Sequence, residues 1–385
     1  MGQTSKITQI FELGWNEYTD SHHVNAIQYK AGYSIRNCKS KLMGFNTVTC
    51  SECGFSETHY NSCHNRNCPN CQVIDRIRWV DKRKSEVIDS PYFHMVFTIP
   101  SELYPLIYKN QRKLYGLLHK CVSETILELS RDKKYIGGVP GIIQVLHTWG
   151  QELNYHPHIH CIVSGGCLSP DKQQILYAGK HFYIPVRVMS KKFRGKILFY
   201  LKKLKESGEL NLYGNCQKYK NSYEWNELIN KLYSIDWVVY TKETFNKFGN
   251  AIDYLGKYTH RVAISNKRIK TFDKDGVTFS ARDYRTGKYN DIHLSLSDFI
   301  GRMMKHVLPA GVQKIRYYGF LNNRYKNINL ELIFRLQNKI RFKAKFEGAT
   351  VADIMMDVYG VDIMKCPCCG KRTFLPGRFI YPLRE

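Results

Sequence analysis

The chain has 385 residues, which is enough for two or three domains and at least one sizeable hydrophobic core. Lysine and arginine number 58 against 33 aspartate and glutamate residues, so the formal net charge is +25, while 43% of the residues are hydrophobic. This composition excludes a largely disordered chain, and the charge makes a polyanion, above all nucleic acid, the expected partner.

Periodicity and turn residues predict an α+β fold. In chain order we expect a helix at 4–20, a cysteine-rich segment at 38–72, a helix at 74–89, a strand at 91–100, a helical region at 102–131, a strand hairpin of 142–150 and 156–166, a helix at 187–205, a strand at 235–242, a helix at 250–260, a strand at 261–265 and a second hairpin at 277–296. The shifts in composition divide the chain into a zinc-binding domain at 1–90, a catalytic domain at 91–330 and a basic C-terminal extension at 331–385.

Membrane insertion is not expected. No apolar run approaches the roughly 18 residues of a spanning helix, and the first residues lack the apolar segment of a secretory signal. Lys6 stands where a myristoylation motif requires serine or threonine. We therefore expect a cytoplasmic protein whose 13 cysteines bind metal rather than form disulfides.

Two cysteine pairs, each with two intervening residues, predict a structural zinc site. Cys50 and Cys53 form the first pair, and Cys68 and Cys71 form the second. Each such turn can direct two thiolates at one ion, and four thiolates complete a tetrahedron. We therefore expect one structural zinc held by these four residues, with Cys63 as an alternative ligand.

Other cysteines leave a second zinc site open. Cys63 and His64 could combine with Cys38 and His59. Near the C-terminus, residues 366–369 resemble half of a zinc site that would use Cys366 and Cys369, but no partner pair is evident from the sequence.

Residues 156–163 (HPHIHCIV) suggest a catalytic metal site. On a strand, His158 and His160 share one face, while Ile159, Cys161 and Val163 face the other side. His147 and Gln151 precede them in the hairpin, and Gln151 is our preferred third ligand from its place near the turn. Two imidazoles and an amide oxygen would leave positions for water and phosphate on Mg²⁺ or Mn²⁺.

Tyr254 and Tyr258 lie one helical turn apart in the helix expected at 250–260. Such a pair can arise from core packing alone. Beside a metal site in a basic protein, however, a phenolate is a competent nucleophile for a phosphodiester, and Lys257 could help the phenol to ionise. Gly256 would allow DNA to approach the backbone.

These segments together resemble the two-tyrosine HUH transposases of the insertion sequence 91 family. The similarity extends over nearly the whole chain: the cysteine-rich segment resembles the family's zinc-binding domain, and residues 91–100, 146–166, 254–266, 306–321 and 366–370 resemble its successive signature blocks. The resemblance implies an antiparallel-sheet HUH endonuclease core. It also implies metal ligation by His158 and His160, 5′-phosphotyrosine links on Tyr254 and Tyr258, and a bacterial, nucleoid-associated protein.

The function expected from the resemblance is rolling-circle transposition of single-stranded DNA, with Zn²⁺ as structural and Mg²⁺ or Mn²⁺ as catalytic cofactor. A rolling-circle replication initiator or relaxase shares this chemistry and is an alternative. A histidine-triad nucleotide hydrolase would also fit residues 156–162, but not the zinc cysteines or the charge. A non-catalytic zinc-dependent DNA-binding regulator would leave the histidine and tyrosine pairs without a role.

The basic stretches 187–205 and 301–345 are expected to bind DNA phosphates. The candidate contact residues are Arg66, Lys191, Lys192, Arg194, Arg261 and Arg316.

Overall fold

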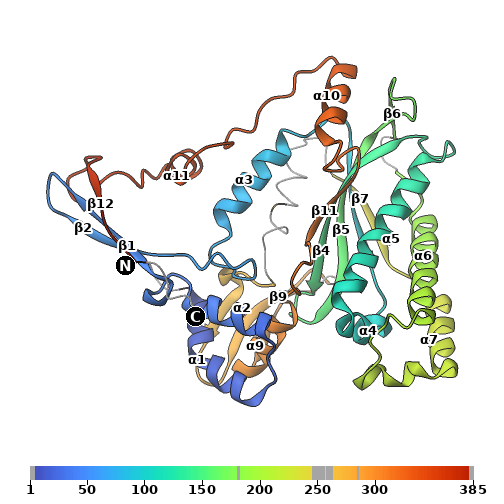
Figure 1. Cartoon of the computed structure of the whole chain (residues 1–385), viewed down its shortest axis with the longest axis horizontal. Coiled ribbons are helices and arrows are strands. Elements are labelled where there is room, and N and C mark those ends of the chain that lie inside the picture. Colours follow the sequence, from blue (N-terminus) through green and yellow to red (C-terminus); the bar gives the residue numbers. More distant parts are fainter. Residues whose placement is uncertain (1–4, 180–182, 245–255, 257–262, 284–285, 381–385) are drawn as a thin grey trace.

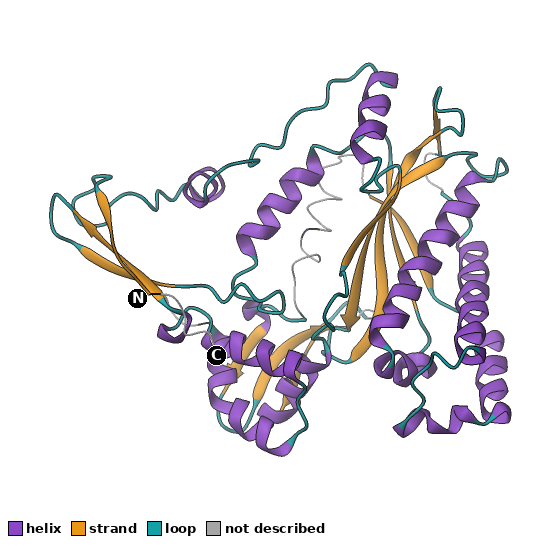
Figure 2. Cartoon of the chain, in the orientation of Figure 1, coloured by secondary structure: helices purple, strands orange, loops and turns teal. Residues whose placement is uncertain are grey.

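The computed structural model describes residues 5–179, 183–244, 256, 263–283 and 286–380. Within these residues the chain forms three antiparallel sheets with helices around them, as Figure 2 shows. The predicted α+β class is confirmed.

The largest sheet, called the central sheet below, lies between α3 on one side and α5 and α6 on the other, to the right of the middle of Figure 1. Its strands are β3 (Tyr92–Thr98), β4 (Val139–Trp149), β5 (Tyr155–Leu168), β6 (Ile175–Tyr177), β7 (Val239–Thr244) and β11 (Ile315–Gly319). The order is β11-β4-β5-β3-β7, and β6 pairs with the last residues of β5. The predicted hairpin of residues 142–166 is confirmed as β4 and β5, the central pair of this sheet.

Helices cover both faces of the central sheet. The main hydrophobic core lies under α4 (Tyr104–Lys109), α5 (Gln111–Arg131), α6 (Val186–Glu206) and α7 (Ser222–Ser234). A smaller core on the other face involves α3 (Val73–Lys84) and α10 (Lys326–Leu336). Ile159, Cys161 and Val163 are fully buried in the main core, as the alternation along this strand predicts.

A second unit joins the N-terminal helices to a segment more than 200 residues later. It contains α1 (Lys6–Ser21), α2 (Ala26–Asn37), β8 (Ile269–Phe272), β9 (Val277–Arg282), β10 (Tyr289–Leu294) and α9 (Leu296–Lys305). Ser5 caps α1, and Asn25 with Gln28 forms a capping box at the start of α2. The apolar faces of α1 and α9 are buried against each other and against β9.

The third unit brings the C-terminal segment beside residues near the start of the chain. Strand β12 (Phe374–Ile380) pairs with β1 (Phe45–Cys50), and β1 pairs with β2 (Ser56–Tyr60). Residues after α10 cross the top of the view in Figure 1 and pass through α11 (Val351–Tyr359) before reaching this sheet. The segment assigned to a C-terminal extension therefore shares a sheet with the segment assigned to the zinc-binding domain.

Two other predictions need comment. Residues 263–265 do not form a strand. The strand predicted at 261–265 is therefore wrong for these three residues, which are the ones that the structure describes. The helix expected at 250–260 lies outside the described residues except for Gly256, which is helical and buried.

Candidate metal centres and active site

Three histidines converge on the face of the central sheet that carries α3. His158 and His160 come from β5, and His147 is the neighbour of His158 on β4. One ring nitrogen of each lies within 4.8 Å of those of the others. The Nε2 atoms of His158 and His160 are 3.0 Å apart, and the rings of His147 and His160 have centroids 4.4 Å apart. The strand register therefore assembles a three-nitrogen cluster.

Neighbouring groups orient the two β5 imidazoles. Nδ1 of His160 is 2.9 Å from Nε2 of His94 on β3, and Nδ1 of His158 is 2.6 Å from the carbonyl oxygen of His156. Each ring thus uses Nδ1 in a hydrogen bond and turns Nε2 toward the other. Such partners fix the tautomer and orientation of metal-binding histidines.

Burial keeps these rings in the form that binds metal. His158 and His160 are only 8% and 9% exposed. Burial lowers the pKa of His158 to about 3, and burial with the neighbouring His147 holds the pKa of His160 well below its usual value. Neutral imidazoles can lie close together without charge repulsion, and a neutral ring nitrogen can bind a divalent ion.

The third member of the cluster is His147, whereas our preferred ligand from the sequence was Gln151. Gln151 lies in the turn between β4 and β5, and its main-chain carbonyl accepts a hydrogen bond from Arg268. A register shift between His147 and Trp149 alters the direction of the chain before that turn. His147, the other candidate from the sequence, is thus the third nitrogen donor of the cluster, and metal binding by Gln151 stays a prediction.

The tyrosine pair lies outside the described residues, as does Lys257, but Gly256 between the tyrosines is described. A Cβ atom added to Gly256 would lie 2.2 Å from Cγ2 of Val80 on α3. Val80 packs against the core on the histidine face of the sheet. Gly256 thus allows close contact with α3, and the sequence-based interpretation that it leaves space for DNA is wrong.

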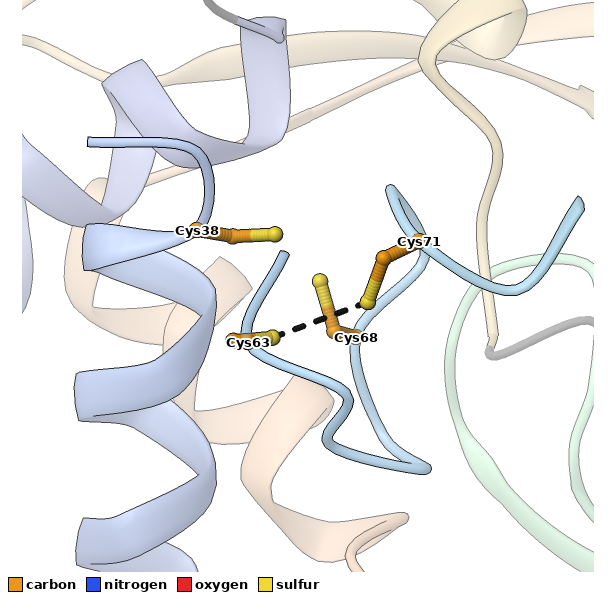
Figure 3. A group of neighbouring side chains, drawn as sticks. All are labelled: Cys38, Cys63, Cys68 and Cys71. Carbon is orange, nitrogen blue, oxygen red and sulfur yellow. Dashed lines mark hydrogen bonds between the residues drawn. The ribbon is translucent and has the colours of Figure 1, made fainter. Parts of the chain in front are cut away.

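Four cysteines form a cluster at the end of α2. Cys38 follows this helix, and Cys63, Cys68 and Cys71 lie on the loop before α3 (Figure 3). The four sulfurs lie within 4.8 Å of one another, and those of Cys63 and Cys71 are 3.7 Å apart. Zinc–sulfur bonds of about 2.3 Å in a tetrahedron place sulfurs about 3.8 Å apart. The donor set and its spacing fit a structural zinc ion.

A second four-cysteine cluster joins β1 to the C-terminal segment. Cys50 lies 3.6 Å from Cys369, and Cys53 lies 3.7 Å from Cys366, between sulfur atoms. The Thr373 hydroxyl lies 3.2 Å from the Cys50 sulfur, within hydrogen-bond distance. This cluster also fits structural zinc.

The two halves of the second cluster have the same local structure. In each, a glycine directly after the second cysteine has a positive φ, 69° at Gly54 and 76° at Gly370. Each glycine N–H donates to the carbonyl of the first cysteine, Cys50 or Cys366, over 3.0 and 2.9 Å. The repeated pattern Cys-x-x-Cys-Gly was therefore the sequence signal that could have matched the C-terminal pair with its partner.

The prediction of one zinc site made of Cys50, Cys53, Cys68 and Cys71 is corrected by these clusters. The structure divides these four residues between two sites, each completed by cysteines from elsewhere. Cys63 belongs to the cluster with Cys38, Cys68 and Cys71.

Two of the residues predicted to contact DNA form hydrogen bonds within the protein instead. Arg66 donates hydrogen bonds of 2.8 to 2.9 Å to main-chain carbonyls of residues 308, 309 and 312. Arg194 donates to the carbonyls of Tyr233 and Ile235. We therefore no longer assign these two guanidinium groups to DNA.

The other candidates have different surroundings. Lys191 is exposed on α6, Lys192 forms a 2.8 Å ion pair with Glu128, Arg316 is half-buried in β11, and Arg261 lies outside the described residues. Helix α6 packs in the core on the face opposite the histidines. DNA binding by these four residues stays a prediction.

Among the described residues, no helix is long and apolar enough to cross a membrane.

Comparison with known proteins identifies the family. Residues 141–328 match the family described as "Putative transposase", and residues 10–99 match the family described as "Transposase zinc-binding domain". The putative transposase y4qJ of Sinorhizobium fredii is 34% identical over 94% of this chain and 92% of its own length. The transposase for insertion sequence element IS801 of Pseudomonas savastanoi pv. phaseolicola is 26% identical over 93% of this chain and 85% of its own length.

No solved structure matches the chain significantly. The matched families span both the zinc-binding segment and the histidine strand, and the relatives are similar over nearly their whole lengths. The chain therefore belongs to the transposases of the insertion sequence 91 family.

Proposed function

We propose that this transposase nicks and rejoins single-stranded DNA at the ends of its element through 5′-phosphotyrosine links. Tyr254 and Tyr258 supply the nucleophilic oxygens, and His147, His158 and His160 hold a divalent ion. The observation that carries the proposal is the convergence of three neutral imidazoles on the face of the sheet against which α3 packs.

A bound divalent ion would polarise the scissile phosphate and stabilise the charge on the leaving oxygen. A donor set of three imidazoles favours a borderline ion over Mg²⁺, which prefers oxygen ligands. With His147 instead of Gln151 as the third ligand, we therefore expect the bound ion to be Mn²⁺ rather than Mg²⁺.

The tyrosines perform the bond exchange. In the nick, a tyrosine oxygen that has lost its proton bonds to phosphorus, the bond from phosphorus to the 3′-oxygen breaks, and that oxygen takes up a proton. The energy of the phosphodiester is kept in the phosphotyrosine, so a 3′-hydroxyl can later attack the link without ATP. In the helix expected at 250–260 the second tyrosine would lie one turn from the first, where it could accept a second DNA end.

Single-stranded DNA suits this site because an unpaired strand bends into a sheet surface more easily than a stiff duplex. The net charge of +25 supports binding to its phosphates. The named relatives are transposases, which favours transposition over the replication initiator and the nucleotide hydrolase.

Replacing His158 and His160 together by alanine tests the proposal. We expect nicking of an element-end oligonucleotide to fall at least about a hundredfold, because the ion that stabilises the leaving oxygen is no longer held. Affinity for the same DNA should persist, since it depends on many charges. Gel assays of nicking with Mn²⁺ or Mg²⁺ and fluorescence anisotropy of binding measure the two effects.

His293→Ala is the matched control, because this histidine is exposed on β10. It should leave nicking and binding unchanged. Undiminished nicking by the double alanine variant would refute the metal assignment.

The contact between Gly256 and Val80 gives a second prediction. Gly256→Ala would place a methyl group 2.2 Å from Cγ2 of Val80, so the segment must move away from α3. A displacement of about 1 Å can cost about a hundredfold in rate. We expect adduct formation to fall at least tenfold, and Val80→Ala in the same chain to restore most of it.

Val80→Ala alone is the control, and it should have a small effect on the rate of adduct formation measured on denaturing gels. If Gly256→Ala forms adduct at the normal rate, or the second substitution restores nothing, the contact does not position the tyrosine segment.

A further inference from the structure

A pocket of about 190 Å³ lies beside the histidine centre. One wall comes from the loop that carries Cys63, Cys68 and Cys71 of the cluster at the end of α2 (the α2 cysteine cluster): Arg66 and Asn67 lie on this loop, and Gln72 follows it. The other wall comes from the sheet and its adjoining segments, which supply Trp149, His306 and Lys314. Pockets for drug-sized ligands have about 300 to 1,000 Å³. This one suits a single ring system of the size of a nucleobase.

Trp149 connects the pocket to the histidine centre. Its indole stacks on the ring of His147, with centroids 4.7 Å apart and an angle of 19° between the planes. The register shift of β4 lies between these two residues. A group stacked in the pocket would therefore lie next to a phosphate at the histidine cluster.

The pocket is basic. The Lys314 ammonium lies 5.0 Å from the centre of the Trp149 ring, and Arg66 also lines the pocket. None of the described residues that line the pocket is acidic. An aromatic ring can stack with a nucleobase, and a nearby cation can bind the negatively charged phosphate of the backbone. Because no carboxylate lines the pocket, nothing there repels that phosphate.

The walls are held in place by hydrogen bonds. Arg66 binds the carbonyls of residues 308, 309 and 312, and the side-chain amides of Asn67 and Gln72 donate to Asn65 over 3.2 and 3.1 Å. On the other wall, the ring of His306 is 3.2 Å from the hydroxyl of Thr148 and 3.0 Å from the carbonyl of Leu153. A pocket with fixed walls can select its ligand without a large ordering cost.

We infer that this pocket receives one unpaired nucleobase of the DNA strand whose neighbouring phosphate lies at the histidine centre. The base stacks on the part of the Trp149 indole that lines the pocket rather than on the face against His147, and the Lys314 side chain moves from the ring to the backbone phosphate beside the base. This inference rests on the proposed function for the identity of the ligand. It assigns a further role to the α2 cysteine cluster, which holds the loop that forms one wall of the pocket.

Binding of an element-end single strand with one abasic position at a time tests the inference. The strand is labelled with fluorescein, and its affinity is measured by anisotropy without added Mg²⁺ or Mn²⁺. For the unsubstituted protein we expect one position at which base removal lowers affinity between about 5- and 150-fold, the range that stacking on an aromatic side chain provides.

With Trp149→Ala, the intact strand should bind more weakly, and base removal at that position should have no further effect. Trp149→Phe should keep most of the sensitivity because it can still stack. Trp225→Phe is the matched control, since this tryptophan packs in the core on the opposite face of the sheet, and its abasic profile should equal that of the unsubstituted protein.

The inference is overturned if no single position is sensitive, or if the same position is equally sensitive in Trp149→Ala. Should Trp149→Ala not fold, the same scan with Trp149→Leu, which keeps apolar bulk but has no aromatic face, decides, and an unchanged profile overturns the inference. Because these measurements involve no cleavage, failure of the tyrosine or metal assignments is detected separately.

Discussion

The double substitution Tyr254→Phe and Tyr258→Phe is expected to abolish the covalent protein–DNA adduct. Phenylalanine keeps the ring but removes the oxygen that would bond to phosphorus. Loss of a nucleophile commonly lowers a rate by factors of about 10⁴ to 10⁶. Each single substitution should leave some nicking but impair complete transposition, because two DNA ends must be held.

Labelling each end of the DNA in turn measures this effect and its polarity. With a 5′-phosphotyrosine link, an element-end strand labelled at its 3′ end should migrate with the protein on a denaturing gel. The same strand labelled at its 5′ end should appear as a short free product with a 3′-hydroxyl. The double variant should give neither signal.

Tyr240→Phe is the control because Tyr240 is an alternative nucleophile within the described residues. It lies on β7, half-exposed, and its ring centroid is 6.5 Å from that of His94, which contacts His160. Its substitution should leave the adduct intact. An adduct that survives in the double variant, or that disappears with Tyr240→Phe, would show that the nucleophiles are assigned wrongly.

Replacing Cys366 and Cys369 by serine is expected to remove one of two tightly bound zinc ions. These residues supply half of the ligands that hold the C-terminal segment against β1. Since structural zinc contributes about 10 to 16 kcal/mol of binding free energy in small zinc domains, β12 should separate from β1 without it. Metal analysis should fall from two zinc ions per chain to one, and proteases should cut within 337–350.

Cys368→Ser is the matched control. Cys368 lies between the two ligands and is exposed, and it is not part of the cluster. It should retain both zinc ions and resist proteolysis as before. Two zinc ions remaining in the double serine variant would refute the assignment of this site.

Substitution of Cys68 should have a larger effect on the fold. Cys68 is fully buried in the core that joins α1 and α2 to β9 and α9, whereas the cysteines of the other cluster belong to none of the three hydrophobic cores. Loss of the α2 cluster should therefore unfold the N-terminal unit, while loss of the other cluster should release only the C-terminal segment. Thermal unfolding of Cys68→Ser against Cys366→Ser measures the difference.

The sequence alone determined which candidate ligands share a strand face or a turn, because that information is local. Alternation along β5 sets His158 and His160 on one face and Ile159, Cys161 and Val163 on the other, whatever the strand pairs with. In the same way, the cysteine pairs at two-residue spacing identified structural zinc, because a tight turn by itself directs both sulfurs at one ion.

Tertiary structure decided which of these local pieces meet. The pair Cys50 and Cys53 is closed by Cys366 and Cys369, which are more than 300 residues away, because β12 pairs with β1. The nearer pair, Cys68 and Cys71, instead meets Cys38 at the end of α2. Spacing cannot distinguish these pairings, since any four thiolates satisfy zinc equally and only the packing of strands and helices brings particular ones together.

The third histidine illustrates the same limit at short range. His147 and Gln151 lie within five positions of each other, and both were compatible with a hairpin. The register of β4 against β5 set His147 opposite His158, and the irregularity beyond it carried the chain into the turn before Gln151. Residue type and order thus determined which candidate ligands this transposase carries, whereas strand register and long-range packing determined which of them come together, because a site requires side chains to meet in space.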